Sequence, residues 1–145
     1  MNSITKITNL ENFTNLDMID LHDNNISGAI DFQTCFGMLK NLKTLNLSNN
    51  AIEEVNINCA MSSLVEINLR HNRIKTFKIN SPNLSSLAKM FLSTNQIKTF
   101  DKVLTSTNML SKLTELTFEN NPVEKDANIL EVLKEKFPSL NSSSL

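Results

Sequence analysis

The sequence predicts an α/β solenoid with a parallel β-sheet on its concave face, and three observations support this class. An eleven-residue pattern recurs five times in the 145 residues. Every copy carries an asparagine at the same place, and a segment with helical spacing follows the last copy. Because one copy contains a single short strand, it cannot bury its apolar side alone, and at least ~3 copies must stack to form a core.

The repeated pattern is L-x-x-L-x-L-x-x-N-x-I, in which other apolar residues replace some of the leucines. The copies begin 22 to 26 residues apart, at Leu16, Leu42, Leu64, Leu87 and Leu113. In the L-x-L part, both leucines point to one face of a strand and the residue between them points to the other. Stacked copies therefore build a leucine core, with the x residues on the concave surface. The pattern resembles that of the leucine-rich repeat family over almost the whole chain.

The asparagine of each copy follows the strand, where the chain turns into the core. There its amide can bond buried backbone groups that otherwise cost ~1–3 kcal/mol each. We expect a stacked, structural ladder formed by Asn24, Asn50, Asn72, Asn95 and Asn121.

After each asparagine, apolar residues return in steps of about three, for example Ile52 and Val55, or Ile74 and Phe77. This spacing resembles the intracellular short-repeat subclass typified by the phosphatase-regulator family. The resemblance implies 3₁₀ turns or short helices on the convex face. The two longest repeats predict fuller helices over residues 31–39 and 101–110, with Asp31 and Asp101 as their N-caps.

We expect a single domain over residues 1–145, with a partial repeat at 1–15, five repeats at 16–122, and a cap and tail at 123–145. The cap contains a predicted helix over 126–137, whose spacing places Ile129, Leu130, Leu133 and Phe137 on one face. It resembles the C-terminal cap of the intracellular subclass, except that asparagine stands where an aspartate usually follows the second leucine. At the other end, residues 2–16 read as the back half of a repeat without its strand. The first strand is then a sheet edge, covered by a partner or continued in a longer protein.

Composition excludes several classes of function. The net charge of −1, without a block of like charges, argues against a nucleic-acid partner held by phosphate contacts. No apolar run approaches the ~20 residues that span a bilayer, and the first residues lack the features of a signal peptide. Cys35 and Cys59 are expected to be reduced interior thiols, which favours a cytoplasmic protein, with the cilium, cytoskeleton and nucleus left open.

The sequence contains no nucleophile motif with a histidine base and no glycine loop for phosphate, so we expect no enzyme, cofactor or small-molecule substrate. His22 lies near Asp20 and Asp23, but without a third strong ligand we expect no metal site.

The candidate partner-binding residues are the x positions of the pattern and their neighbours. Phe91 stands where a water-facing residue is expected, and exposed aromatics often anchor interfaces. Arg70, one repeat earlier, can offer a two-pronged fork to a carboxylate. The alternatives are that Phe91 covers a neighbouring side chain and that Arg70 is a solvated charge. The full candidate set is Phe91, Arg70, Lys89, Glu66, His71, Asn68, Glu115, Asp20 and His22.

These features predict a non-enzymatic module that binds a protein on its concave sheet, as a subunit or adaptor of a larger intracellular complex. Residues 64–123 are similar to microtubule- and cilium-associated repeat proteins, such as the repeat subunit associated with the tubulin polyglutamylase complex, which favours a cytoskeletal or ciliary role. The alternatives are a regulatory module of a protein phosphatase and a spliceosomal repeat protein that holds an RNA-binding partner. A secreted or receptor ectodomain is disfavoured by the missing signal peptide and cysteine-rich caps.

Overall fold

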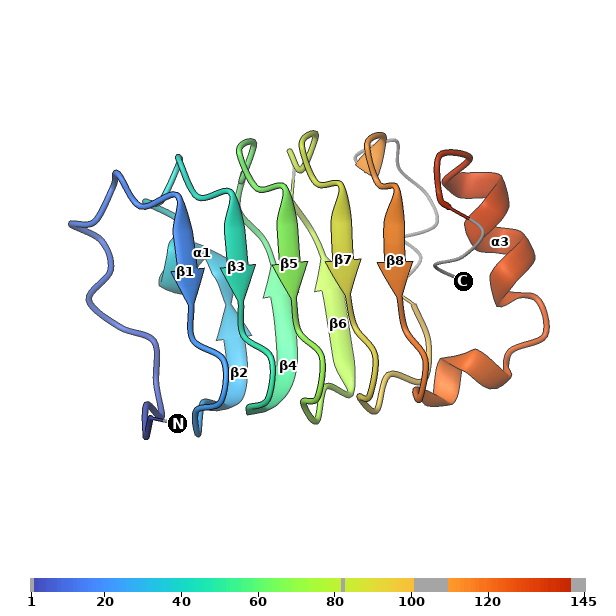
Figure 1. The fold of residues 1–145 in the computed structure, drawn as a ribbon, viewed down its shortest axis with the longest axis horizontal. Helices are drawn as coiled ribbons and strands as arrows, with labels where there is room; N and C mark the ends of the chain where they lie inside the picture. The colour runs from blue at the N-terminus through green and yellow to red at the C-terminus, as the bar shows by residue number, and fades with distance from the viewer. Residues whose placement is uncertain (1, 82, 101–109, 142–145) are drawn as a thin grey trace.

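Each repeat contributes one strand to a five-stranded parallel sheet (Figure 1). The computed structural model describes residues 2–81, 83–100 and 110–141. The strands lie side by side in chain order and are β1 (Met18–Asp20), β3 (Thr44–Asn46), β5 (Glu66–Asn68), β7 (Lys89–Phe91) and β8 (Glu115–Thr117). The predicted solenoid with a parallel sheet is confirmed.

The register of this sheet follows the sequence pattern. The first residues of the strands are paired in one row: Met18, Thr44, Glu66, Lys89 and Glu115. The last residues form a second row: Asp20, Asn46, Asn68, Phe91 and Thr117. The middle residue of each strand, such as Leu45 or Ile67, points into the core and is buried. The prediction that the leucine positions of each strand face the core is therefore confirmed.

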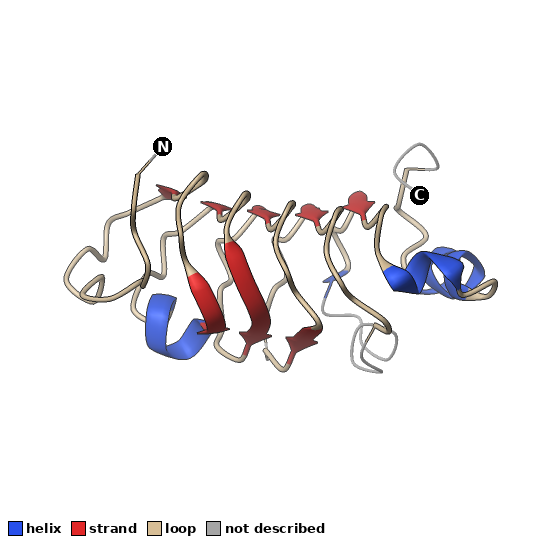
Figure 2. Ribbon diagram, turned by 90° about the horizontal axis from the view of Figure 1, so that it is seen from below, coloured by secondary structure: helices blue, strands red, loops and turns tan. Residues whose placement is uncertain are grey.

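The opposite face of the solenoid carries a second sheet (Figure 2). It has three parallel strands, β2 (Ser27–Asp31), β4 (Ala51–Ile57) and β6 (Thr76–Ile79). Strands β4 and β6 stand where 3₁₀ turns or short helices were expected in the second and third repeats. Ala29 pairs with Glu54 although Gly28 pairs with Ile52, so β4 carries one extra residue, Glu53, at a bulge. This bulge produces the three-residue spacing between buried Ile52 and Val55 that resembled a helix.

The first helix expected on this face is present but short. α1 (Phe32–Phe36) begins after its predicted N-cap, where Asp31 Oδ1 accepts a 2.9 Å hydrogen bond from Thr34 N. Phe32 and Phe36 are buried and pack edge to face, with ring centroids 5.0 Å apart. Residues 101–109 of the second predicted helix, including Asp101, lie outside the described residues.

The turn that recurs between the two faces of each repeat contains an asparagine ladder. Asn72 shows the arrangement: its Nδ2 donates to Leu47 O at 3.0 Å and Leu69 O at 3.1 Å, and its Oδ1 accepts from Ile52 N at 3.1 Å. The same types of contact recur at Asn50, Asn95 and Asn121. Each amide therefore joins its own repeat to the repeat before it. No buried side-chain nitrogen or oxygen in the described ranges lacks a hydrogen-bond partner.

The residue before each ladder asparagine adopts the left-handed backbone conformation. These residues are Asp23 (φ 54°), Asn49 (φ 54°), His71 (φ 54°), Thr94 (φ 59°) and Asn120 (φ 57°). Asparagine and aspartate tolerate positive φ because their side chains are short and polar, whereas a β-branched threonine is strained there. The fourth repeat thus contains a local backbone strain that the other four avoid.

A short 3₁₀ helix, η2 (Pro122–Lys125), and α3 (Ile129–Lys136) follow β8 at the right-hand end of Figure 1. The expected helix over 126–137 starts later, because Asp126 Oδ1 accepts from Asn128 N in a turn that precedes it. Ile129, Leu133 and Phe137 are buried as expected. Leu130 is 41% exposed, so its assignment to the same apolar face was wrong.

Candidate protein-binding face

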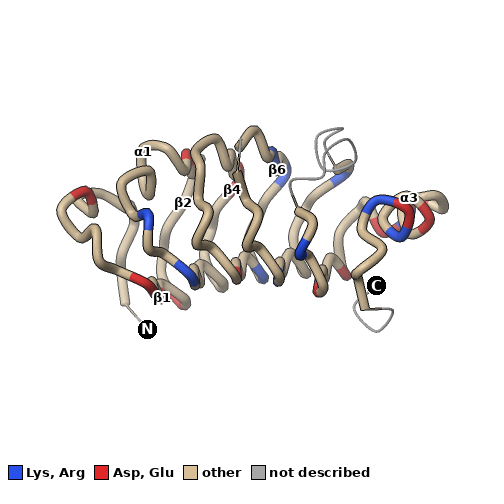
Figure 3. Tube along the Cα trace, turned by 90° about the horizontal axis from the view of Figure 1, so that it is seen from above, with Lys and Arg blue, Asp and Glu red and all other residues tan. Residues whose placement is uncertain are grey.

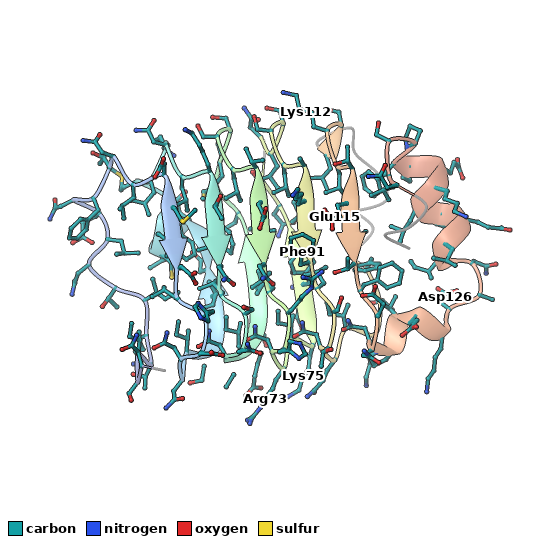
Figure 4. The ribbon with its side chains drawn as sticks, viewed as in Figure 1. Arg73, Lys75, Phe91, Lys112, Glu115 and Asp126 are labelled. Atoms are coloured by element: carbon teal, nitrogen blue, oxygen red, sulfur yellow. The ribbon has the colours of Figure 1, made fainter. Side chains whose placement is uncertain are left out.

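The solvent-facing side of the five-stranded sheet carries most of the candidate residues. We call it the sheet face and define it by the two paired rows together with the next outward position of each repeat, His22, Ser48, Arg70, Ser93 and Glu119. In Figure 4, Phe91 and Glu115 lie in front of neighbouring strands of this face. Arg73 and Lys75 project from its lower edge and Lys112 from its upper edge.

The centre of the sheet face is an arginine stacked on an aromatic ring. Arg70 Cζ lies 4.1 Å from the ring centroid of Phe91. Phe91 is only 8% exposed, so the expectation that it faces water freely was wrong. It occupies the predicted face, but the half-buried Arg70 side chain covers it. The alternative that Phe91 covers a neighbouring side chain agrees with this contact, whereas Arg70 is half-buried and stacked and is not simply a solvated charge.

Polar contacts extend this stack to the last repeat. Arg70 Nη2 donates to Thr117 Oγ1 at 3.3 Å, and Ser93 Oγ lies 2.8 Å from the same hydroxyl. Ser93 also donates to the carboxylate of Glu119. The guanidinium is therefore linked to a carboxylate through two hydroxyl groups, and its position is fixed across three repeats. We call Arg70, Phe91, Ser93, Thr117 and Glu119 the central cluster.

Charges of opposite sign alternate beside this cluster. Lys89 stands in register between Glu66 and Glu115, and its Nζ lies 3.8 Å from Glu66 Oε2. Such exposed pairs contribute only ~0.2–1 kcal/mol to stability. Figure 3 shows basic and acidic positions interspersed along the solenoid.

Three residues of the second row have a structural task that the sequence analysis missed. The Oδ1 atoms of Asp20, Asn46 and Asn68 each accept a 3.2 Å hydrogen bond from the backbone N–H two residues later. Asn68 Oδ1 is therefore fixed beside Arg70, because it accepts the hydrogen bond from the Arg70 backbone N–H. The sequence signal was an Asx residue two positions before the turn in each of the first three repeats, a spacing typical of side-chain-closed turns.

The candidates at the β1 end form a separate group. His22 Nδ1 lies 2.7 Å from Asp20 Oδ1, and His22 Nε2 lies 3.9 Å from Asp23 Oδ2. The hydrogen bond with Asp20 raises the pKa of His22, and the same bond lowers the pKa of Asp20. His71 instead belongs to the turn beyond β5, where its side chain is exposed. Residues 2–81, 83–100 and 110–141 contain no group of three or more side chains arranged to hold a metal ion.

Both cysteines are free thiols. Cys59 is buried, whereas Cys35 is only half-buried, which corrects the expectation that both lie in the interior. Burial raises the pKa of each thiol. Little reactive thiolate therefore forms near neutral pH.

Single-strand repeats, an asparagine ladder and a parallel sheet define the class of protein as a leucine-rich repeat solenoid. Residues 14–74 match the family described as leucine rich repeat. The chain is 31% identical over 121 residues to the "Brassinosteroid LRR receptor kinase" of Solanum lycopersicum and 32% identical over 121 residues to the "Systemin receptor SR160" of Solanum peruvianum. The chain belongs to the leucine-rich repeat family.

The two relatives are much longer proteins. The matches cover 81% of this chain, which spans 9% of the length of each relative. Leucine-rich repeat domains generally bind other proteins and are not themselves catalysts, so the domain is of the protein-binding kind. Among the described residues, no helix is long and apolar enough to cross a membrane.

Proposed function

We propose that this domain binds a protein partner on its sheet face, with Arg70 and Phe91 at the centre of the contact. The observation that carries the proposal is the stack of Arg70 on Phe91. Arginine and aromatic residues dominate the energetics of many interfaces, and a rigidly held side chain loses little conformational entropy on binding. Here Phe91 and Thr117 hold the guanidinium before any partner arrives.

The guanidinium retains donors for a partner. It has five N–H groups, and one of its nitrogens donates to Thr117. No Asp or Glu oxygen of the described chain lies within 4.0 Å of its nitrogens. A carboxylate of the partner can therefore bind Arg70 in the two-pronged geometry that guanidinium groups favour.

The remaining candidates surround this centre in the proposed contact. Glu66, Lys89 and Glu115 present alternating charges on the adjoining strands, and such patterns select partners and accelerate association. Asn68 lies two residues before Arg70 and His71 directly after it. Asp20 and His22 lie at the β1 end and enter the contact with a partner long enough to span the sheet.

We further propose that the domain is a subunit or adaptor of a larger intracellular complex, with a microtubule or ciliary assembly as the first candidate. The resemblance of residues 64–123 to microtubule- and cilium-associated repeat proteins supports this role. A phosphatase regulator and a spliceosomal repeat protein are the alternatives within the cell. The similarity to two receptors favours a further candidate, a ligand-binding segment of a receptor.

Affinity purification followed by mass spectrometry separates these roles. Tubulin or axonemal proteins support the first candidate, and a phosphatase catalytic subunit or splicing factors support the two intracellular alternatives. Recovery with secreted ligands or receptor co-factors supports the last. A role is rejected when its class of partner is absent from purifications that contain another class.

The binding mode is tested by titration calorimetry with the purified partner. Arg70→Glu reverses a charge in the proposed contact, so it should weaken binding and alter its salt dependence. Phe91→Ala should cost ~1–3 kcal/mol of binding free energy, mostly through faster dissociation. Because Phe91 is largely buried, Phe91→Leu is needed beside it to keep apolar volume while removing the ring.

The matched control is Lys98→Glu, an exposed charge reversal on the turn beyond the ladder. It should leave affinity unchanged, and circular dichroism should show that all variants fold. If both central variants bind like the parent while Lys98→Glu loses affinity, the partner sits on an edge or on the opposite sheet, and the proposal is wrong.

A further inference from the structure

The outer edge of β1 presents backbone groups that are free to pair. Lys43 N donates to Asp17 O at 2.7 Å and Leu21 N donates to Asn46 O at 2.8 Å, so alternate residues of the first strand point toward β3. The peptide groups of Met18 and Asp20 point away from it. Among the described residues they have no backbone partner, and β1 is the last strand of the sheet. At the other end of the sheet, Asn141 N donates to Thr114 O at 3.0 Å.

The residues before β1 occupy the place of the back half of a repeat. Asn24 Oδ1 accepts from Ile4 N at 3.0 Å, as Asn50 Oδ1 accepts from Ile26 N at 3.0 Å. Asn25 N donates to Ile4 O at 2.9 Å, as Ala51 N donates to Ile26 O at 2.8 Å. Ile4 thus takes the role that Ile26 has one repeat later. In Figure 2 this segment forms a coil before the chain enters β1. No described residue pairs with the outer side of β1 in the sheet.

Apolar side chains at this end are covered less than their counterparts elsewhere. Leu16 and Leu21 are half-buried, although the equivalent leucines of the next repeat, Leu42 and Leu47, are at most 1% exposed. Met18 is 59% exposed and Phe13 55% exposed. A hollow of about 290 Å³, lined by residues 12–16, lies immediately before the strand. A further strand with inward-pointing apolar residues would cover the two leucines as β3 covers one side of them.

The charge at this edge is acidic. Asp17 and Asp20 are exposed and Asp23 is half-buried. Within the sheet, cross-strand neighbours of opposite charge already occur at Glu66 and Lys89. A basic side chain opposite Asp20 would repeat this arrangement and compete with His22 for the carboxylate.

We propose that the outer edge of β1 binds an extended segment of a partner protein as an additional parallel strand. The segment carries apolar residues in the order apolar-x-x-apolar-x-apolar and places a lysine or arginine beside Asp20. Backbone hydrogen bonds to Met18 and Asp20 hold it, and its apolar side chains cover Leu16 and Leu21. This edge uses the backbone of β1, whereas the proposed contact on the sheet face is centred on Arg70, just after β5, and Phe91 of β7. Variants at Arg70 and Phe91 therefore test one proposal, and the β1 edge peptide tests the other.

The probe is a fluorescent synthetic peptide with the sequence of residues 42–50, LKTLNLSNN. Within the chain this segment contains β3, which pairs with the other edge of β1. We expect saturable binding to the whole chain, measured by anisotropy, and slower hydrogen exchange at the amides of Met18 and Asp20. The same peptide with Asn46→Lys should bind up to about fivefold more tightly at low salt, because a cross-strand charge pair contributes ~0.2–1 kcal/mol. A peptide with Leu45→Ser and Leu47→Ser is the control and should not bind.

The chain variant Met18→Pro removes an outward N–H that has no partner within the described fold. Proline is tolerated at sheet edges, and thermal melting checks that the variant folds. It should bind the peptide about tenfold more weakly, the effect of one lost hydrogen bond and a blocked edge. Met18→Ala keeps the N–H and should bind like the parent.

Three results would overturn the proposal. One is no binding to the parent chain at peptide concentrations up to about 1 mM, the weakest affinity of interest. Another is equal binding by the parent and by folded Met18→Pro, which would place the peptide elsewhere. The third is self-association of the chain without peptide that Met18→Pro abolishes, which would make a second copy the occupant instead of a partner segment.

Discussion

Arg70 Cζ lies 4.1 Å from the centre of the Phe91 ring, so the two residues shield each other from water. Arg70 leaves the sheet just after β5, and Phe91 ends the neighbouring β7. A phenylalanine on the solvent side of a strand is compatible with folding here because a guanidinium covers its face. The contact also spans two repeats, so it helps to hold them together.

A double-mutant cycle on these two residues measures their coupling. Arg70→Ala and Phe91→Ala, alone and combined, should show an interaction free energy of ~0.5–1 kcal/mol in urea denaturation, the usual size of a cation–π contact near the surface. Phe91→Ala paired with Lys75→Ala is the control, because Lys75 projects from the sheet edge (Figure 4). The control pair should be additive within ~0.3–0.5 kcal/mol. Additivity of Arg70→Ala with Phe91→Ala would show that the stack has no energetic consequence.

Sequence periodicity could predict the five-stranded sheet because its alternation is strict. Leu45 and Leu47 must share one side of the chain, and the same constraint in every repeat sets the register of all five strands. The N-cap of α1 was also predictable. Asp31 precedes a run with helical spacing, and aspartate is one of the few residue types that cap a helix N-terminus effectively.

The second sheet could not be predicted from the steps of three. One extra residue, Glu53, changes the alternation of β4 into the spacing of a helix over part of its length. The alternating pairs Val55 and Ile57, and Phe77 and Ile79, were the signal that was overlooked. The cover over Phe91 was not predictable either, because it depends on how a long side chain from another repeat lies across the sheet.

The ladder should make a large contribution to stability in the middle of the solenoid. Asn72→Ala leaves the buried Ile52 N without its hydrogen-bond partner, which costs ~1–3 kcal/mol, and Leu47 O keeps only the 3.1 Å hydrogen bond from Asn50 Nδ2. We therefore expect a loss of ~1–3 kcal/mol in the free energy of unfolding, measured by urea denaturation. Asn24→Ala should cost less, because the amide nitrogen of Asn24 contacts carbonyls of its own repeat only. Equal effects at both positions would contradict the link between repeats that we assign to the amide.

The hydrogen bond between His22 and Asp20 should be visible in a titration. Since it raises the pKa of His22 above its usual value of about 6.5, the folded protein binds this proton more tightly than the unfolded chain. The stabilisation is complete below the unfolded pKa and disappears as the pH rises through the folded pKa of His22. The pKa of Asp20 is lowered, so its contribution has the opposite pH dependence. That stabilisation is present above the pKa of Asp20 in the unfolded chain and disappears as the pH falls through the pKa of Asp20 in the folded protein.

Nuclear magnetic resonance of the His22 ring protons measures this pKa. In Asp20→Asn the value should fall back toward that of an unperturbed histidine, because the principal cause of the shift is removed. The change in stability should be small, since both side chains are about half exposed. An unchanged His22 titration in Asp20→Asn would mean that the two side chains do not bond in solution.

The strain at Thr94 predicts a stabilising substitution. Its φ of 59° places a β-branched side chain in the left-handed region, and its hydroxyl has no hydrogen-bond partner among the described residues. The equivalent residue two repeats earlier is Asn49, at φ 54°. Thr94→Asn should therefore raise the free energy of unfolding by ~0.5–1 kcal/mol, equivalent to a rise of about 1–4 °C in Tm. The reciprocal change, Asn49→Thr, should lower stability by a similar amount.

Thr99→Asn is the matched control, because Thr99 is exposed and does not have a positive φ. It should leave Tm unchanged in the same calorimetric scans. If Thr94→Asn and Thr99→Asn behave alike, asparagine has no advantage at the ladder turn and the strain argument fails. If Asn49→Thr alone is destabilising, the fourth repeat relieves its threonine through contacts that the other repeats lack. The pair of reciprocal changes therefore separates backbone strain from side-chain packing at this turn.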